Sequence, residues 1–286
     1  MSTAVATADR KIRKDRPRTN WWATALLVVL SLTILVPLYF AFVTAFKTPP
    51  ELAESGFALP SSFNLDNFRE AWRLTSFPSR LMTSAIVTVG AVVLTLLTNS
   101  MVAYAISRNM NRPGFKALYY FFISALFVPF PIIMLPVVKE TAILGIDNEA
   151  GLILLYTVYG LALNILMYTS YLKSVPEELE ESARIDGAST WTVFWKIVFP
   201  LLVPMNATVG ILTCLWAWND FLLPLVILSD PNTQTLPLAQ YVFQGQFNTN
   251  YPAAFASYLM AIAPMVLVYV FAQKWIISGV MRGSHR

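Results

Sequence analysis

Residues 23–46 read ATALLVVLSLTILVPLYFAFVTAF, an apolar stretch without a charged side chain. A helix of about 20 such residues crosses the ~30 Å hydrocarbon core of a bilayer, so this stretch predicts a transmembrane helix. It is longer and begins later than the apolar core of a secretory signal, and no small-residue cleavage site follows it. We therefore expect the helix to remain in the mature protein.

Five further apolar stretches of similar length follow along the chain. Of the 286 residues, 56% are hydrophobic and 13% are charged, whereas soluble domains carry about 25% charged residues. This composition excludes a water-soluble enzyme and predicts an all-α membrane protein with six transmembrane helices. The predicted spans are Trp21–Phe46, Leu81–Ile106, Ala117–Val138, Gly151–Leu172, Leu201–Leu228 and Ala253–Ala272.

The sequence lacks the side chains that most catalytic and metal sites require. Its single cysteine, Cys214, cannot form a disulfide within one chain, and its single histidine, His285, lies next to the end. No G-x-x-x-x-G-K-[ST] loop for nucleotide phosphates is present. We expect no catalytic residue, no metal site and no bound cofactor in this chain, so any uphill transport takes its energy from another protein.

Lysine and arginine residues concentrate on one side of the predicted membrane. They crowd the N-terminal tail, the connections between spans two and three and between spans four and five, and the C-terminal tail. By the positive-inside rule, both termini are predicted to be cytoplasmic. A basic tail can also bind nucleic acid, but orientation explains its place beside a span, so we expect membrane lipid and no nucleic acid as partners.

Two polar or helix-breaking features interrupt the spans. Prolines kink membrane helices, either as tolerated bends or as bends that shape a pathway, and from the sequence both remain open. Asp220, in WAWNDFLLP, is an intramembrane carboxylate that we expect to line a cavity or cap a broken helix rather than to relay protons. The prolines concerned are Pro37, Pro129, Pro131, Pro136, Pro204, Pro224 and Pro264.

The connection at residues 173–200, KSVPEELEESARIDGASTWTVFWKIVFP, predicts two short helices that meet at Gly187. Ser174 and Glu177 have the spacing of a capping box for the first helix, and Ser189 can cap the second. Pro200 is expected to end the second helix. The predicted apolar stripe of the second helix comprises Trp191, Phe194, Trp195 and Val198, and the glutamates expected on a solvated face of the first are Glu177, Glu178 and Glu180.

The same connection resembles the E-A-A-x3-G-x9-I-x-L-P motif of membrane subunits of binding-protein-dependent ABC importers. It departs from the motif at Ser182, where the family has alanine, and at Phe199, where it has leucine. In that family this loop is the coupling region that docks on the ATPase. The resemblance assigns ATPase coupling to Glu181, Ser182, Ala183, Asp186, Gly187, Ala188, Ile197 and Pro200.

The stretch from Thr235 to Gly283 resembles the C-terminal part of carbohydrate permeases of the maltose-transporter type, specifically the six-span partner. The resemblance implies a bacterial cytoplasmic membrane protein that forms a heterodimer with a second permease. Its other implied partners are two ATPase subunits, which hold ATP and magnesium, and an extracytoplasmic solute-binding protein. The residues assigned to binding-protein contact are Gln244, Gly245 and Gln246.

The resemblance divides the chain into a basic tail, a first span with its outer loop, a transmembrane core and a second tail. The basic tail covers residues 1–20, and the first span with its outer loop covers 21–80. The transmembrane core covers 81–272, with the coupling loop at 173–200, and the second tail covers 273–286.

Aromatic and amide side chains in the spans have the chemistry of sugar recognition, although packing between helices is the commoner role of such residues. The candidates for pathway lining are Asn164, Trp216, Trp218, Asn219 and Asp220. Import of glycerol phosphate or another polyol-like solute is the nearest alternative, but the spans lack cations for a phosphate. A secondary carrier is disfavoured because the spans nearly lack charged pairs and because the coupling motif is present, and the same motif disfavours a scaffold or receptor.

Overall fold

The computed structural model describes residues 20–243 and 250–283, and within them every regular element is helical. The long helices are α1 (Trp21–Ala45), α4 (Phe77–Arg108), α7 (Glu149–Leu172), α11 (Val203–Asn219) and α14 (Tyr251–Gly283), and the bent segment between α4 and α7 contains α5 (Pro113–Ser124), η1 (Ala125–Phe127) and α6 (Phe130–Leu144). The short elements are α2 (Pro49–Glu54), α3 (Asp66–Leu74), α8 (Glu178–Ile185), α9 (Thr190–Val193), η2 (Phe194–Val198), α10 (Phe199–Leu201), α12 (Leu222–Ile227), η3 (Pro231–Thr233), α13 (Leu236–Ala239) and η4 (Gln240–Phe243).

Four helices of the described chain are long and apolar enough to cross a membrane, namely α1, α4, α7 and α14. Two bent pairs of helices raise the number to six if each pair counts as one span. The first pair joins α5–η1 to α6 at 107°, and the second joins residues 190–201 to α11 at 76°. The predicted count of six is therefore the upper limit of what length and composition support.

The third predicted span is bent, as its prolines led us to expect. The backbone at Pro129 is extended, with φ −64° and ψ 134°, and α6 begins directly after it. Neither Pro129 nor Pro131 carries an N–H to donate, so the first turn of α6 cannot be joined to η1 by helical hydrogen bonds. The prediction that this segment is not one straight helix is confirmed.

The fifth predicted span, Leu201–Leu228, is divided in the structure. Its main helix, α11, ends at Asn219, the backbone of Asp220 is extended, and the short helix α12 follows. The helix is thus broken at Asp220, as the sequence led us to expect, because the Asp220 carboxylate accepts the Leu222 N–H at the start of the next turn.

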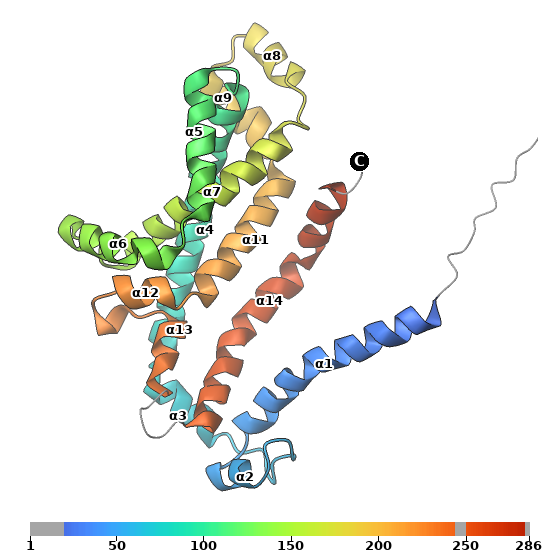
Figure 1. Ribbon diagram of the computed structural model, residues 1–286, viewed down its shortest axis with the longest axis vertical. Helices are drawn as coiled ribbons and strands as arrows, with labels where there is room; N and C mark the ends of the chain where they lie inside the picture. Colours follow the sequence, from blue (N-terminus) through green and yellow to red (C-terminus); the bar gives the residue numbers. More distant parts are fainter. Residues whose placement is uncertain (1–19, 244–249, 284–286) are drawn as a thin grey trace, which may run out of the picture.

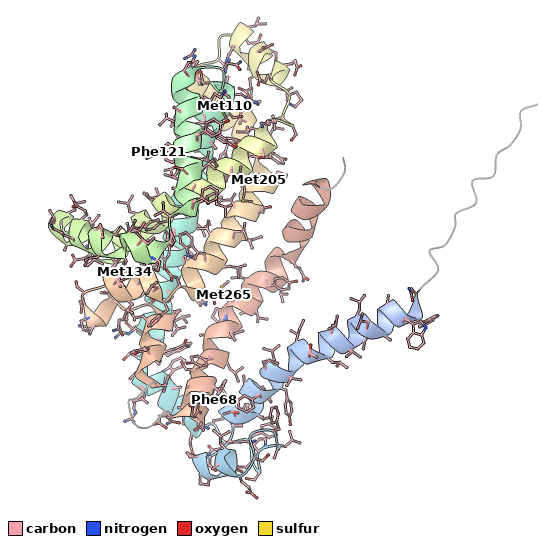
Figure 2. All side chains as sticks on the ribbon, viewed as in Figure 1. Phe68, Met110, Phe121, Met134, Met205 and Met265 are labelled. Atoms are coloured by element: carbon pink, nitrogen blue, oxygen red, sulfur yellow. The ribbon has the colours of Figure 1, made fainter. Side chains whose placement is uncertain are left out.

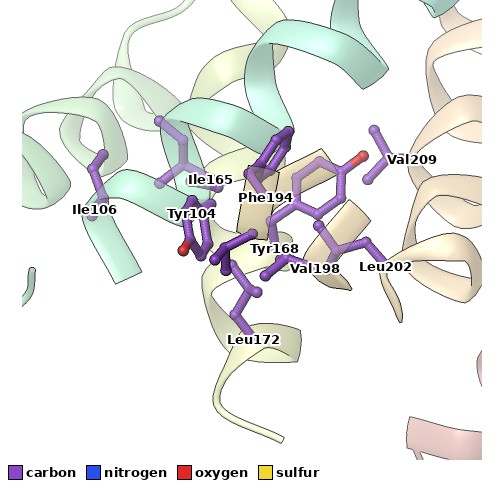
Figure 3. Packing of buried hydrophobic residues seen from close by; sticks show 11 residues of the cluster. Tyr104, Ile106, Ile165, Tyr168, Leu172, Phe194, Val198, Leu202 and Val209 are labelled. Atoms are coloured by element: carbon purple, nitrogen blue, oxygen red, sulfur yellow. The ribbon is translucent and has the colours of Figure 1, made fainter. Parts of the chain in front are cut away.

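Helix α4 is the central element, and it packs against α7 along most of its length and against α11. The core cluster at one end of these helices contains aliphatic side chains around Tyr104 and Tyr168, shown in Figure 3. The Tyr168 hydroxyl donates to Asn206 Oδ1 at 2.8 Å, joining α7 to α11. Buried polar pairs of this kind hold membrane helices together because lipid offers no alternative partner.

Helix α1 lies apart from the bundle and meets α14 only near its C-terminal end (Figure 1). Its buried residues are Val43, Thr44 and Ala45, and Phe40 packs against Phe255 of α14 with the ring centroids 5.5 Å apart. The side chains at residues 21–39 are exposed (Figure 2). An apolar helix exposed in this way is stable in lipid or against another subunit rather than in water.

The turn between α6 and α7 gives a prediction about stability. Gly151 lies in the first turn of α7, and a Cβ built there would be 1.7 Å from the carbonyl oxygen of Ile146, which belongs to the backbone and cannot rotate away. We expect Gly151→Ala to lower the free energy of unfolding by about 3 kcal/mol. The melting temperature of the detergent-purified protein measures this loss.

Gly114→Ala is the matched control, because nothing lies within 4 Å of a Cβ at that position. We expect it to leave the melting temperature unchanged. A Gly151→Ala protein that melts with the wild type would show that the α6–α7 turn is not packed as described.

Candidate functional site

The turn between α8 and α9 has a defined backbone geometry centred on Gly187. This residue has φ +86°, in the left-handed region that a side chain disfavours. The Ala188 N–H donates to the Ala183 carbonyl at 2.9 Å and the Gly187 N–H donates to the Arg184 carbonyl at 3.0 Å. These two bonds form a Schellman motif, which ends α8 at a fixed angle. The predicted glycine bend is confirmed.

The second helix of the loop begins as predicted but does not end at Pro200. Ser189 accepts a hydrogen bond from the Thr192 N–H at 3.2 Å and so caps α9. The helix then widens into the π-helical turn η2, in which the Phe199 N–H donates to the Phe194 carbonyl, and continues through α10 to Leu201. Pro200 has no N–H for the carbonyl of Lys196, so it widens the helix instead of ending it.

The predicted apolar stripe of this second helix is only partly buried. Phe194 and Val198 lie in the core cluster and Trp195 packs against it, with its ring centroid 4.9 Å from that of Phe194. Trp191, by contrast, is 61% exposed. The loop therefore anchors one edge of the second helix in the bundle and presents Trp191 at the surface.

The first helix, α8, is tied to the bundle by a buried ion pair. Arg108, the last residue of α4, places its Nη2 2.8 Å from Glu180 Oε1, and their side chains are 10% and 4% exposed. The other oxygen of Glu180 accepts a hydrogen bond from the Tyr104 hydroxyl at 2.7 Å and lies 3.5 Å from Arg184 Nη2. Both oxygens of this buried carboxylate are thus partnered, as the burial of a charged group requires.

Arg108 also fixes the end of α7. Its Nη1 donates to the Leu172 carbonyl at 3.2 Å and its Nη2 donates to the Val175 carbonyl at 3.3 Å. Leu172 ends α7, and carbonyls at a helix end have no partner within the helix. One guanidinium therefore joins the ends of α4 and α7 to the start of the loop.

These contacts correct two predictions about the first helix. Glu180 is not on a solvated face, because Tyr104 and Arg108 supply a buried site for its carboxylate. The capping box of Ser174 and Glu177 does not form: Ser174 Oγ donates to the Tyr171 carbonyl, and Glu177 turns to Arg108 at 3.2 Å. Glu177 and Glu178 are exposed, as expected.

The outward side of the loop carries the residues assigned to coupling. Glu181, Asp186 and Gly187 are exposed, and the Glu181 carboxylate forms no hydrogen bond or ion pair with the described residues. Ile185 is 86% exposed, an unusual position for an isoleucine outside the lipid-facing helices. Of the other assigned residues, Ser182 and Pro200 are exposed and Ala183, Ala188 and Ile197 are half-buried.

A second feature is a cavity of about 610 Å³ where the two interruptions of the spans meet. It is lined by residues at the α5–α6 bend, by α7, and by Trp216, Asp220 and Leu222 at the α11–α12 break. Asp220 Oδ1 accepts from the Leu222 N–H at 3.1 Å and Oδ2 accepts from the Tyr156 hydroxyl at 3.0 Å. The cavity wall is mostly aliphatic and aromatic, with this carboxylate at the break.

The other residues assigned to the pathway lie elsewhere. Trp218 and Asn219 line a separate cavity of about 270 Å³ beside α14, and the Trp218 indole donates to the Ala261 carbonyl at 3.3 Å. Asn164 is buried on α7, and its amide nitrogen has no hydrogen-bond partner among the described residues. The structure thus brings Trp216 and Asp220 together but not all five residues. Gln244, Gly245 and Gln246 lie outside the described residues.

Comparison with known proteins places the chain in a family. Residues 97–282 match the family described as "binding-protein-dependent transport system inner membrane component". The chain belongs to this family. The match includes the α8–α9 turn, the central helices α7 and α11, the C-terminal part of α4 and nearly all of α14, and it confirms the resemblance drawn from the E-A-A-type motif.

Curated relatives of this permease extend over its whole length. The multiple sugar-binding transport system permease protein MsmG of Streptococcus mutans is 38% identical over 276 residues, which cover 96% of this chain and 99% of that protein. The melibiose/raffinose/stachyose import permease protein MelC of Bacillus subtilis is 30% identical over 275 residues, which cover 96% and 99%. These relatives are permease subunits of transporters rather than enzymes.

A solved structure shares the fold of the permease. A chain of a bacterial ABC transporter involved in the import of the acidic polysaccharide alginate superimposes with a TM-score of 0.77 over 89% of this chain and 95% of that chain. The two sequences are 23% identical, so this likeness concerns the fold.

The contacts of Asp220 predict what its substitution does. Asp220→Ala removes the acceptor for the Leu222 N–H and leaves the Tyr156 hydroxyl unpaired, which we expect to lower the free energy of unfolding by about 1–3 kcal/mol. Asp220→Asn keeps an oxygen for Leu222 and an amide that can donate to the Tyr156 oxygen, so it should melt much closer to the wild type. Equal losses in the two variants would contradict this account and show that the charge itself is required.

Proposed function

We propose that this chain is the permease subunit of an ATP-driven carbohydrate importer and forms half of its translocation pathway. It pairs with a second permease, two ATPase subunits that hold ATP and magnesium, and an extracytoplasmic binding protein. The observation that carries the proposal is the α8–α9 turn, a short rigid element that is fixed to α4 and α7 on one side and exposed on the other.

The exposed side of this turn suits docking on an ATPase. Ile185 and Trp191 offer apolar surface without cover, and Glu181 offers a carboxylate without an internal partner. Burial of exposed apolar side chains together with a charge-assisted hydrogen bond is a favourable basis for a contact between subunits. The exposed loop, the tails at residues 1–20 and 273–286, and the basic connections then share the cytoplasmic side.

Six spans follow from this proposal when each bent pair crosses the membrane once. The α5–α6 bend of the first pair then lies within the bilayer, and it faces the same cavity as the α11–α12 break, which comes after the second pair. Interrupted helices that meet at a cavity are a common way for transporters to build a pathway. Trp216 and Asp220 are the pathway residues that this cavity supports, whereas Trp218 and Asn219 face the smaller cavity beside α14.

Carbohydrate is the substrate class that both the relatives and the cavity support. The relatives are named for sugars and oligosaccharides. The described lining of the larger cavity contains aromatic rings and a carboxylate but no lysine or arginine. A phosphate ester such as glycerol phosphate would need cationic partners, so this chemistry favours a neutral sugar.

The identity of the partners can be tested directly. Affinity purification of the tagged chain from membranes of its own bacterium, followed by mass spectrometry, should recover a second permease and an ATPase. Uptake of labelled melibiose, raffinose and maltotriose by the reconstituted transporter should then be compared with uptake of glycerol 3-phosphate. Recovery of the chain without any ATPase, or transport of glycerol phosphate alone, would contradict the proposal.

Gly187 provides the sharper functional prediction. An aspartate at position 187 would adopt φ +86° at a cost of about 1–2 kcal/mol. This cost lowers the equilibrium population of the present turn conformation by about tenfold. We expect Gly187→Asp to lower uptake by about tenfold while the transporter still assembles and hydrolyses ATP. Parallel measurements of uptake and of ATP hydrolysis in proteoliposomes check this.

Gly114→Asp is the control for that experiment. Gly114 also has open space around a Cβ but lies outside the positive-φ region, near the start of α5. We expect normal uptake, and a loss equal to that of Gly187→Asp would show that added negative charge, rather than the turn geometry, is responsible.

A further inference from the structure

Helix α8 is held to the rest of the chain in an unusual way. All of its residues lie in the described part of the chain, and the buried one among them is Glu180, a carboxylate. Its apolar residues Leu179 and Ile185 are exposed, and Ala183 packs against the core only in part. The position of α8 therefore depends on the partners of one charged side chain rather than on an apolar ridge.

The partners of Glu180 come mainly from one helix. Tyr104 and Arg108 are one turn apart on α4, so both face the same side of that helix. Arg108 donates to Glu180 through Nε at 2.8 Å and lies equally close through Nη2, which fixes the direction as well as the distance of the contact. A displacement of α8 cannot leave the end of α4 in place without breaking these bonds in a site that excludes water.

The neighbouring glutamate points the other way. Glu181 is exposed and has no partner among the described residues, while Glu180 is enclosed. Adjacent residues on a helix are about 100° apart around its axis, so one can face the bundle while the next faces outward. Glu180 thus faces the transmembrane bundle and Glu181 faces outward. A force applied to α8 from its outer side would therefore reach the bundle through Glu180.

We propose that the Arg108–Glu180 ion pair is the positioning device that passes a displacement of α8 to α4. The proposal rests on the proposed function, because it supposes that an ATPase subunit moves α8. Glu181 contacts the partner, Glu180 joins the moving helix to the transmembrane bundle, and Tyr104 holds the second oxygen of Glu180. Glu180 and Arg108 touch neither nucleotide nor solute in this scheme.

The test compares three substitutions on one helix: Glu180→Gln, Glu181→Gln and Glu178→Gln. Hydrogen exchange at the α8 amides is measured on the intact reconstituted transporter, without nucleotide. Because Glu180→Gln removes the buried charge, we expect exchange in α8 to rise about 10- to 100-fold. The exposed control Glu178→Gln should leave the exchange at its wild-type rate.

The second measurement is the amount of ATP hydrolysed for each molecule of labelled raffinose imported, with maltotriose used if raffinose is not transported. A purely structural defect lowers hydrolysis and import together, whereas loss of the connection raises the ratio between them. We expect the ratio to rise at least severalfold for Glu180→Gln and to stay at the wild-type value for Glu178→Gln. Glu181→Gln should instead weaken the association of the ATPase.

Tyr104→Phe is the milder variant if Glu180→Gln does not fold. It removes the 2.7 Å hydrogen bond to Glu180 and keeps the ring and the ion pair, so it should change exchange and ratio in the same direction by a smaller factor. Wild-type exchange and a wild-type ratio in Glu180→Gln would overturn the inference while leaving the proposed function intact. A wild-type chain that recruits no ATPase would overturn the proposed function instead.

Discussion

The ion pair between Arg108 and Glu180 is the contact on which the arrangement of the α8–α9 turn depends. Two opposite charges can be buried together only when their remaining hydrogen-bonding capacity is also met, and here Tyr104, Arg184 and the carbonyls at the end of α7 meet it. The main role of the ion pair is to fix the orientation of α8 relative to α4 rather than to add net stability. An apolar contact could supply the same energy but would not fix that orientation. This explains why α8, whose other side chains are mostly exposed, has a fixed position relative to the membrane helices.

The same rule of satisfied polar groups explains the interruptions within the spans. At the α11–α12 break, the Asp220 carboxylate accepts a backbone N–H that a continuous helix would have paired, and Tyr156 provides the second partner from α7. At the α5–α6 bend, Pro129 and Pro131 carry no N–H, so fewer backbone donors need a partner there. Both interruptions line the same cavity. Polar groups that are unfavourable in contact with lipid therefore lie where a solute could contact them.

Local features of the sequence predicted local features of the structure. The apolar stretches locate α1, α4 and α7 to within a few residues, Gly187 marks the bend and Ser189 caps α9. Helix α14 begins where predicted but continues past Ala272 to Gly283, so the predicted boundary between the last span and the tail was wrong. The burial of Glu180 could not be predicted, because its partner lies 72 residues earlier in the chain and nothing in the acidic run distinguishes it from Glu181. The false capping box at Ser174 has the same cause, since Arg108 competes for Glu177. Trp216 and Trp218, both predicted to line the pathway, face different cavities. The direction in which each side chain points depends on how α11 is rotated about its axis, which the residue types do not reveal.

Helix α4 has no proline beyond its first turn, in contrast to α1, α6 and α14. Its 32 residues form an unbroken rod about 48 Å long. At the end far from α8, Ser84 accepts a hydrogen bond from the Leu236 N–H at 2.7 Å, and Arg80 donates to the Asn232 carbonyl, so the segment before α14 is fastened to this rod as well (Figure 1). Because α4 is a stiff, continuous helix with a loop bound at each end, it cannot rotate about its axis at one end without rotating at the other. The geometry of the two faces of the permease is thereby set jointly, and a state of one face implies a state of the other.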